Sequence, residues 1–171
     1  RLADKDGREY VMRGLRKSAE RYLQAIAFQD QYVIGKFEDT YPEKLLLDLY
    51  TGAHPYAPFT IDRLSDALGM YHTNPKLYYV PKQSVLGDYN KEFGDGLYMI
   101  EEHVSDDHDN LESFGYTKKI ESTYDLMDKL REDEEYSIDQ KEYVKARLFD
   151  ILIGDWDRHV DQWRWAEFKT E

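Results

Sequence analysis

The sequence predicts an α+β fold with two lobes. Strand-like runs occur near the N-terminus and in the middle of the chain, and helical patterns lie between and after them. This order of strand and helices, then strands, then helices is typical of α+β proteins. With 171 residues, 41% hydrophobic and 15% aromatic, the chain is long enough for a core and too rich in aromatic residues for disorder.

The first third of the chain predicts one strand and two helices. Residues 8–15, "REYVMRGL", alternate loosely after the turn signal "DKDG" and predict a strand. Residues 17–31 place apolar side chains on one helical face. Residues 40–52 begin with Thr40 and, three positions later, Glu43, which together form a capping box for a second helix.

The next segment, residues 60–70, "TIDRLSDALGM", predicts another helix. Thr60 is its expected cap and Gly69 its expected end. Its spacing predicts three inward-facing side chains, those of Ile61, Leu64 and Leu68.

The middle of the chain changes character. Residues 75–81, "PKLYYVP", and residues 96–103, "GLYMIEEH", are short β-branched or aromatic runs joined by a turn-rich stretch, and they predict an antiparallel pair. Residues 105–113 read as a solvated polar loop, and residues 122–133 as an amphipathic helix.

The strongest helical pattern comes last, in residues 137–154, "SIDQKEYVKARLFDILIG". Asp139 and Glu142 form its capping box, and Gly154 is its expected stop. The apolar spacing predicts a buried face made of Val144, Leu148, Ile151 and Leu152. "RWAEFK", which starts at Arg164, predicts a strand, so residues 154–165 form a loop after a buried helix.

This loop, "GDWDRHVDQWRW", carries the pattern with the clearest chemistry. Gln162 follows Asp157 by five residues, the separation between the catalytic Asp and the metal-binding Asn of protein kinases. Such spacing lets a carboxylate meet an acceptor hydroxyl while a later side-chain oxygen reaches a metal ion. The three tryptophans of the chain also lie here, and core packing is their expected role.

The stretch "GDWDRHVDQW" resembles the catalytic loop of the atypical kinases, a group that includes phosphoinositide kinases, bacterial toxin-type serine kinases and secreted kinases. Most of the chain is also similar to a kinase-like region of large Bacteroidetes envelope proteins that are often labelled metallophosphoesterase or surface-antigen proteins. The resemblance implies a partial kinase-like two-lobe fold, with residues 1–103 as an N-lobe-like part and residues 104–171 as the start of a helical C-lobe. It also implies a place in the cell envelope, periplasmic or associated with the outer membrane.

The resemblance further implies roles for the loop residues in phosphoryl transfer from ATP with Mg²⁺. Asp157 would be the catalytic base or the carboxylate that orients the substrate. Arg158 and His159 would stabilise charge on the transferred phosphoryl group or hold Asp157. Gln162 would take the metal-ligand position, although it is one methylene longer than the Asn of the family pattern, and magnesium geometry is strict.

In the first lobe, the resemblance places Arg13 where kinases carry the lysine that contacts ATP, with Lys17 as a rival. The two side chains are not equivalent, because Arg binds phosphate bidentately. The backbone of Glu101 and Glu102 would meet the adenine edge. An acidic partner for Arg13 is expected from a nearby helix, with Glu43 as one option.

Two parts of the kinase pattern are expected outside these residues. A second metal-binding Asp should follow the Gln162 position by roughly a dozen residues or more, and nine residues follow it here. The Gly-rich phosphate loop should precede Arg13, and only Gly7 stands there. We therefore expect a fold truncated at both ends, and no phosphate transfer by these 171 residues alone.

Two other functions stay open. A pseudokinase or protein-interaction module is favoured by Gln162 and Arg13, which both depart from the kinase pattern. A metal-dependent hydrolase is suggested by an alternating set, Asp155, Asp157, His159 and Asp161, and by the acidic run "DDHD" at residues 106–109.

Composition excludes other classes. A formal charge of −12 argues against a non-specific nucleic-acid binder, which needs a basic surface. The chain has no cysteine, which excludes disulfides and thiolate chemistry. No apolar run approaches the roughly 18 residues of a membrane span. The expected partners are a nucleotide and an acceptor, and protein hydroxyl, lipid headgroup and small molecule are all open for the acceptor.

Overall fold

The computed structural model describes residues 1–15, 36, 40–51, 54–155 and 158–169. It has mixed helices and small antiparallel sheets, which confirms the predicted α+β class. The chain divides into two compact units, the first made of Arg1–Ile61 with Pro75–Glu101 and the second of Asp62–Asn74 with Glu102–Glu171. The predicted helix of residues 17–31 lies outside the described residues.

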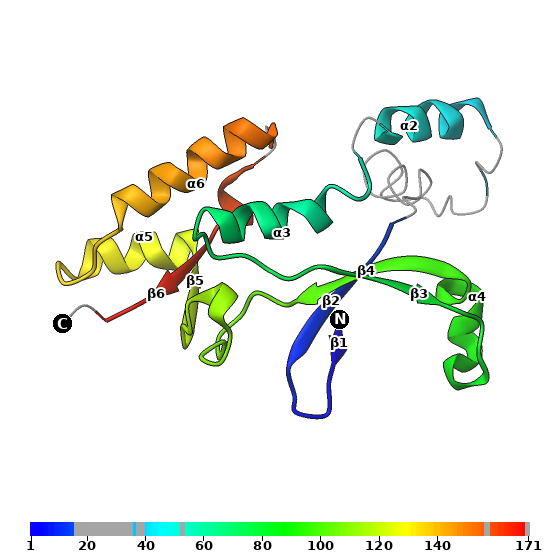
Figure 1. Cartoon of the computed structure of the whole chain (residues 1–171), viewed down its shortest axis with the longest axis horizontal. Helices are drawn as coiled ribbons and strands as arrows, with labels where there is room; N and C mark the ends of the chain where they lie inside the picture. The colour runs from blue at the N-terminus through cyan, green and yellow to red at the C-terminus, as the bar shows by residue number, and fades with distance from the viewer. Residues whose placement is uncertain (16–35, 37–39, 52–53, 156–157, 170–171) are drawn as a thin grey trace. The chain divides into compact units, whose positions relative to one another are not determined.

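The first unit is built on a four-stranded sheet in the order β1-β2-β4-β3 (Figure 1). The strands β1 (Leu2–Ala3) and β2 (Glu9–Gly14) form an antiparallel hairpin. The strand β3 (Lys76–Val80) runs antiparallel to β4 (Gly96–Glu102). The strand predicted after "DKDG" and the antiparallel pair predicted in the middle of the chain are both confirmed.

Asp4 shapes the turn between β1 and β2. Its carboxylate accepts the backbone N–H groups of Asp6 and Arg8, both at 2.9 Å. Gly7 takes the positive φ of 86° that the turn requires, because glycine has no side chain to obstruct it. The N–H donors, that of Arg8 foremost, lower the pKa of Asp4.

The start of helix α2 in the first unit is set by neighbouring residues. Helix α2 (Tyr41–Thr51) starts after Thr40, whose hydroxyl accepts the Glu43 N–H at 3.5 Å, so the predicted cap is confirmed. The turn-rich stretch between β3 and β4 forms a short 3₁₀ helix, η1 (Ser84–Tyr89), and one helical turn, α4 (Asn90–Phe93).

Helix α3 (Pro58–Ala67) begins earlier than predicted. Thr60 is not its cap, and its hydroxyl donates instead to the Ala57 carbonyl at 2.8 Å, inside the first turn. Pro58 occupies the first helical position, where the missing N–H costs no hydrogen bond.

The end of α3 is as predicted, but its inward face is not. Gly69 has a φ of 60°, and the Met70 N–H donates to the Ser65 carbonyl at 2.9 Å, which closes the helix. Leu64 and Leu68 are exposed, at 48% and 44%, so their predicted burial is wrong. Ser65 is the buried residue of this helix.

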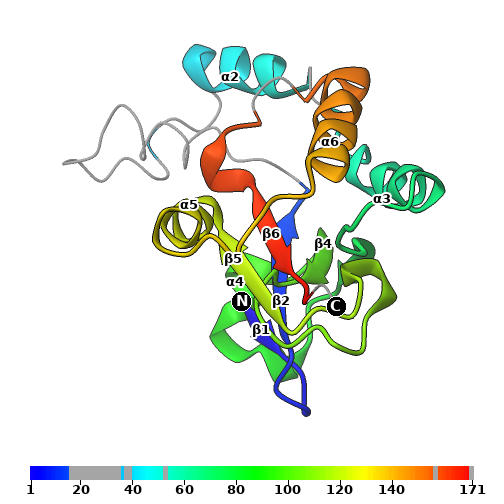
Figure 2. The same cartoon turned by 90° about the vertical axis from the view of Figure 1, so that its left-hand side faces the viewer.

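The second unit contains a two-stranded antiparallel sheet. In it, β5 (Lys119–Ser122) pairs with β6 (Arg164–Glu167), the strand predicted from "RWAEFK". Figure 2 shows the two strands side by side, with α5 (Thr123–Glu132) beside them. The hydroxyl of Ser122 caps α5 by accepting the Asp125 N–H at 3.2 Å.

Helix α6 (Gln140–Ile153) has the predicted boundaries. The Asp139 carboxylate accepts the N–H groups of Lys141 and Glu142, at 3.0 and 3.1 Å. Gly154 follows in the left-handed conformation, with a φ of 74°. The N-cap and the glycine stop are therefore confirmed.

The predicted buried face of α6 is wrong. Its four members are exposed to solvent, at 53% for Val144, 62% for Leu148, 71% for Ile151 and 81% for Leu152. The helix instead buries Phe149 and Asp150, each 6% exposed. One of the buried positions of α6 is therefore a charged residue, whereas the apolar spacing predicted buried leucine and isoleucine.

The loop of residues 105–113 is only partly solvated. Asp106, Asp107 and Asp109 are exposed, as expected, but His108 is 2% exposed. Its ring stacks on that of Phe114, at the end of the 3₁₀ helix η2 (Glu112–Phe114), with 4.1 Å between centroids. This histidine is part of the core of the second unit.

Candidate functional site

The candidate loop, residues 154–165, begins where α6 ends. Gly154 turns the chain, and the N–H of Asp155 donates to the Asp150 carbonyl at 2.8 Å. Trp156 and Asp157, the predicted catalytic base, lie outside the described residues. The structure resumes at Arg158.

Four charged side chains meet at the end of α6, and we call Arg147, Asp150, Asp155 and Arg158 the α6 charge cluster. Arg147 Nη1 lies 2.9 Å from Asp150 Oδ2, and Arg158 Nε lies 3.6 Å from Asp150 Oδ1. Arg158 Nη2 lies 2.7 Å from Asp155 Oδ2. Arg158 therefore joins the helix to the loop.

The buried carboxylate of Asp150 is the centre of this cluster. Burial raises the pKa of Asp150, and the positive charges of Arg158 and Arg147 oppose that rise, while Asp155 adds to it. Two acids and two arginines make the α6 charge cluster formally neutral. Its charges therefore balance only while all four side chains stay together.

Aromatic side chains pack the far end of the candidate loop against α6. Trp163 and Trp165 stack with centroids 5.9 Å apart, and Tyr143 of α6 lies 5.5 and 5.6 Å from them. The guanidinium of Arg147 lies over the Trp163 ring at 5.7 Å. Both tryptophans have the packing role that the sequence predicts, and Trp156 lies outside the described residues.

The other predicted loop residues are open to solvent. The His159 side chain is 52% exposed, with Nδ1 3.7 Å from Asp161 Oδ2. Gln162 ends the 3₁₀ helix η3 (Val160–Gln162), and its backbone N–H donates to the His159 carbonyl at 3.0 Å. The Gln162 side chain is exposed. Its amide oxygen is of the kind that Mg²⁺ accepts, beside water and phosphate oxygens, so the residue fits the predicted metal-ligand position by donor chemistry.

The predicted nucleotide contacts fall in different surroundings. Arg13 of β2 lies 3.3 Å from Glu101 Oε1 of β4, and both belong to the first unit. Its acidic partner thus comes from a strand, where the sequence suggested a helix. Glu102 belongs to the second unit and accepts the backbone N–H of Asn74 at 2.8 Å. Lys17 lies outside the described residues.

The residues of the alternative metal site do not gather in the described part of the chain. No group of three or more His, Asp or Glu side chains suited to a metal occurs among the described residues. The alternation from Asp155 to Asp161 would need a strand, but its last residues form η3. In the other acidic run, the Asp106 carboxylate accepts the Ile120 N–H at 2.8 Å and serves β5.

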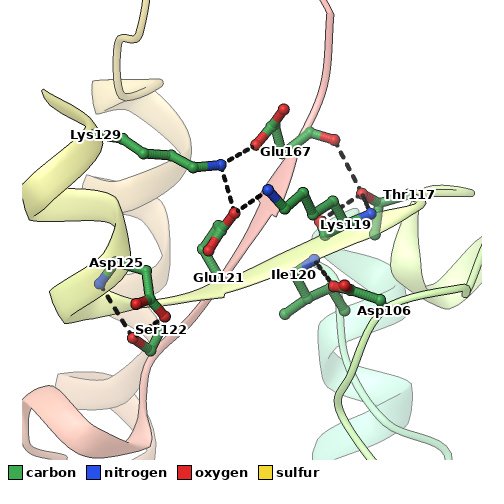
Figure 3. Close-up of polar contacts among 9 residues, drawn as sticks. All are labelled: Asp106, Thr117, Lys119, Ile120, Glu121, Ser122, Asp125, Lys129 and Glu167. Atoms are coloured by element: carbon green, nitrogen blue, oxygen red, sulfur yellow. Dashed lines mark hydrogen bonds and ion pairs between the residues drawn. The ribbon is translucent and has the colours of Figure 1, made fainter. Parts of the chain in front are cut away.

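One ion-pair network of the second unit was not predicted from the sequence. The ammonium of Lys129 lies 2.5 Å from Glu121 Oε1 and 2.6 Å from Glu167 Oε2, and Lys119 lies 2.9 Å from the same Glu121 oxygen (Figure 3). These carboxylates raise the pKa of Lys129, and hydrogen bonding to Lys129 lowers that of Glu121. No sequence spacing could reveal the network, because Glu167 follows Lys129 by 38 positions.

A buried hydroxyl supports the same sheet. Thr117 is 2% exposed, and its hydroxyl lies 2.9 Å from the carbonyls of both Lys119 and Glu167 (Figure 3). It therefore links the start of β5 to the end of β6. We assign a structural role to this network and to Thr117, because they hold together β5, α5 and β6, the strand into which the candidate loop leads.

The fold and the site together define an α+β chain with an acidic loop held between a helix and a strand. Comparison of the chain with models of protein families, with curated proteins and with solved structures finds no match in any of the three. In the described residues, no helix is both long enough and apolar enough to cross a membrane.

Proposed function

We propose that the candidate loop is the catalytic loop of a kinase-like domain that transfers a phosphoryl group from ATP in the intact parent protein. One observation supports this most. The loop is anchored by Arg158 at one side and by its tryptophans at the other, while His159 and Gln162 stay exposed. A catalytic loop needs such a rigid support beneath side chains that remain free to meet a substrate.

In the proposed reaction, the acceptor hydroxyl gives its proton to the Asp157 carboxylate. The oxygen of the acceptor hydroxyl then bonds to the γ-phosphorus of ATP. The bond from that phosphorus to the bridging oxygen breaks, and ADP leaves with the electron pair. His159 stabilises the charge on the transferred group. When bound, Mg²⁺ neutralises phosphate charge, and Gln162 would hold it through its amide oxygen.

Arg13 and Glu101 of the first unit are among the proposed nucleotide contacts. Arg13 presents a guanidinium with five N–H donors, so its pairing with Glu101 leaves donors for a phosphate. Lys17 is the rival for this role, and the backbone of Glu101 and Glu102 would meet the adenine edge. By the same resemblance, the parent protein is placed in the cell envelope.

Thermal unfolding with Mg²⁺ and ATP, compared with Mg²⁺ alone, tests the proposal. We expect the nucleotide to raise the Tm of the chain, and Asp157→Ala and Gln162→Ala each to reduce that rise. Asp109→Ala is the matched control, since Asp109 is an exposed acid of the second unit whose ion pair with Lys118 spans 4.0 Å. A folded wild-type chain whose Tm is the same with and without ATP contradicts the proposal.

A second function, that of a protein-interaction module, is favoured by the exposed face of α6. A hollow beside this helix is lined by apolar side chains and by two lysines: Leu68, Val144, Leu148, Phe149, Leu152, Lys141 and Lys145. Its charged lining residues are both cationic, in a chain with a net charge of −12. An amphipathic helix with carboxylates beside its apolar stripe fits this chemistry.

Fluorescence anisotropy with a labelled peptide of that design tests the second function. We expect binding that Leu148→Gln and Leu152→Gln weaken, and a matched peptide with lysine in place of its acids to bind less tightly. Equal affinity for the two peptides contradicts the proposed complementarity.

A further inference from the structure

We infer that Asp150 is a positioning residue that holds Arg158 as the anchor of the candidate loop, so that Arg158 is not a ligand for phosphate. The catalytic meaning of this inference rests on the proposed function. The anchor itself rests on the geometry of the second unit alone. It excludes one of the two roles that the resemblance leaves open for Arg158, the contact with the transferred phosphoryl group.

Asp150 contacts two residues near the start of the candidate loop, Asp155 and Arg158. Its backbone carbonyl accepts the Asp155 N–H at 2.8 Å, and its carboxylate lies 3.6 Å from Arg158 Nε. One residue of α6 therefore fixes the chain before and after the two intervening positions, one of which is Asp157.

The guanidinium of Arg158 is already engaged. Its Nη2 lies 2.7 Å from Asp155 Oδ2, and its side chain is only 33% exposed. Arg158 Nε is buried and has no hydrogen-bond partner among the described residues, so this end of the guanidinium is turned inward. To turn outward toward a bound phosphate, Arg158 would have to give up its contacts with Asp150 and Asp155.

Charge balance opposes such a departure. With Arg158 in place, the α6 charge cluster holds two positive and two negative side chains. Without Arg158, Asp155 loses its partner at 2.7 Å, and the Asp150 side chain, 8% exposed, keeps one of its two arginines, Arg147 at 2.9 Å. Removal of one partner from a partly buried ion-pair cluster is unfavourable, so the cluster retains Arg158.

Limited digestion with trypsin tests the anchor, because trypsin cleaves after Arg158 only when the loop opens. Cleavage of a locally opened state follows the population of that state, and we expect Asp150→Asn to speed cleavage after Arg158 by about tenfold. Asp161→Asn is the matched control in the same loop, since Asp161 faces His159 instead, and we expect its rate to equal that of the wild type. Cleavage after Arg131 of α5 is the internal reference.

An Asp150→Asn rate equal to the wild-type rate overturns the anchor. If circular dichroism shows that Asp150→Asn does not fold, Asp155→Asn replaces it, since it removes the negative charge from the 2.7 Å ion pair on the loop side. Faster cleavage of that variant supports the anchor, and an unchanged rate overturns it.

Titration of the full chain with Mg²⁺ and ATP separates an anchor from a phosphate ligand. We expect Asp150→Asn and Arg158→Gln to weaken binding by the same factor, and the double variant to be no weaker than either, because both changes break one unit. Weaker binding with Arg158→Gln and unchanged or tighter binding with Asp150→Asn overturns the inference. A wild-type chain that binds no ATP defeats the proposed function and the catalytic meaning of the anchor, while the digestion still decides the anchor itself.

Discussion

The indole N–H of Trp165 donates a hydrogen bond to the hydroxyl of Thr123 at 3.0 Å. The same hydroxyl donates to the Val160 carbonyl at 3.0 Å. The first residue of α5 is therefore tied both to β6 and to η3, the turn that carries Gln162. The candidate loop is supported from α5 as well as from α6.

Removal of this hydroxyl should loosen the loop. We expect Thr123→Val to lower the free energy of unfolding by about 1–2 kcal/mol, since it deletes two hydrogen bonds and leaves the Val160 carbonyl and the indole N–H unsatisfied. Thr123→Ser keeps the hydroxyl and is the control. Urea unfolding followed by tryptophan fluorescence measures both variants, and equal stabilities for valine and serine would show that the hydroxyl is not a support.

Substitutions on the two faces of α6 should change the free energy of unfolding by very different amounts. Leu148→Gln and Leu152→Gln should change the free energy of unfolding by no more than about 0.5 kcal/mol, because both side chains are exposed. Phe149→Ala should cost about 3–5 kcal/mol, because it empties a buried site. Chemical denaturation of the three variants decides between this arrangement and the buried stripe that the sequence predicts.

The contrast shows which features of this chain its sequence can predict. The caps at Thr40 and Asp139 and the stops at Gly69 and Gly154 were predicted because they depend on neighbours within one helical turn. The buried face of α6 was not, because apolar spacing reports which residues share a face and not which face is covered. Burial there follows the charge cluster, which joins α6 to the loop after it, and the packing of Tyr143 on Trp163 and Trp165, which lie beyond that loop.

The candidate site divides in the same way. The exposed positions of His159 and Gln162 agree with the loop that the sequence predicts. The link from Asp150 to Arg158 could not be predicted, since Arg158 lies beyond the end of α6, where helical spacing no longer says which side chains meet. Asp150 was not among the predicted site residues, and its burial in the structure is what distinguishes it.

The N-cap of α6 offers a third prediction. Asp139→Ala should lower the free energy of unfolding by about 1 kcal/mol, because two backbone N–H groups lose their acceptor. Asp139→Asn retains an oxygen acceptor and should cost less. Thermal unfolding by circular dichroism compares the two, and an alanine variant as stable as the asparagine variant contradicts the role of the cap.

The ion pairs of Glu121 predict how stability depends on pH. Hydrogen bonds from Lys129 and Lys119 lower the pKa of Glu121 below a glutamate's ordinary value of 4.5. The unfolded chain therefore takes up this proton at a higher pH than the folded chain does. The stabilisation is present above pH 4.5 and is lost as the pH falls through the lowered value. The raised pKa of Lys129 contributes stability that is fully present below pH 10.5 and is lost only as the pH rises above that value toward the raised pKa.

Glu121→Gln isolates this contribution. At about pH 7 we expect the variant to be less stable than the wild type by roughly 1.5–3 kcal/mol, the range for hydrogen bonds to charged groups. The difference should shrink as the pH falls below 4.5, because protonation of Glu121 in the wild type removes the ionised carboxylate that the variant lacks at every pH. Glu132→Gln, at an exposed position of the same α5 helix as Lys129, is the control and should follow the wild type. Urea unfolding across this pH range measures all three proteins, and a difference between the wild type and Glu121→Gln that stays constant with pH would show that the two lysines do not act through the ionised carboxylate.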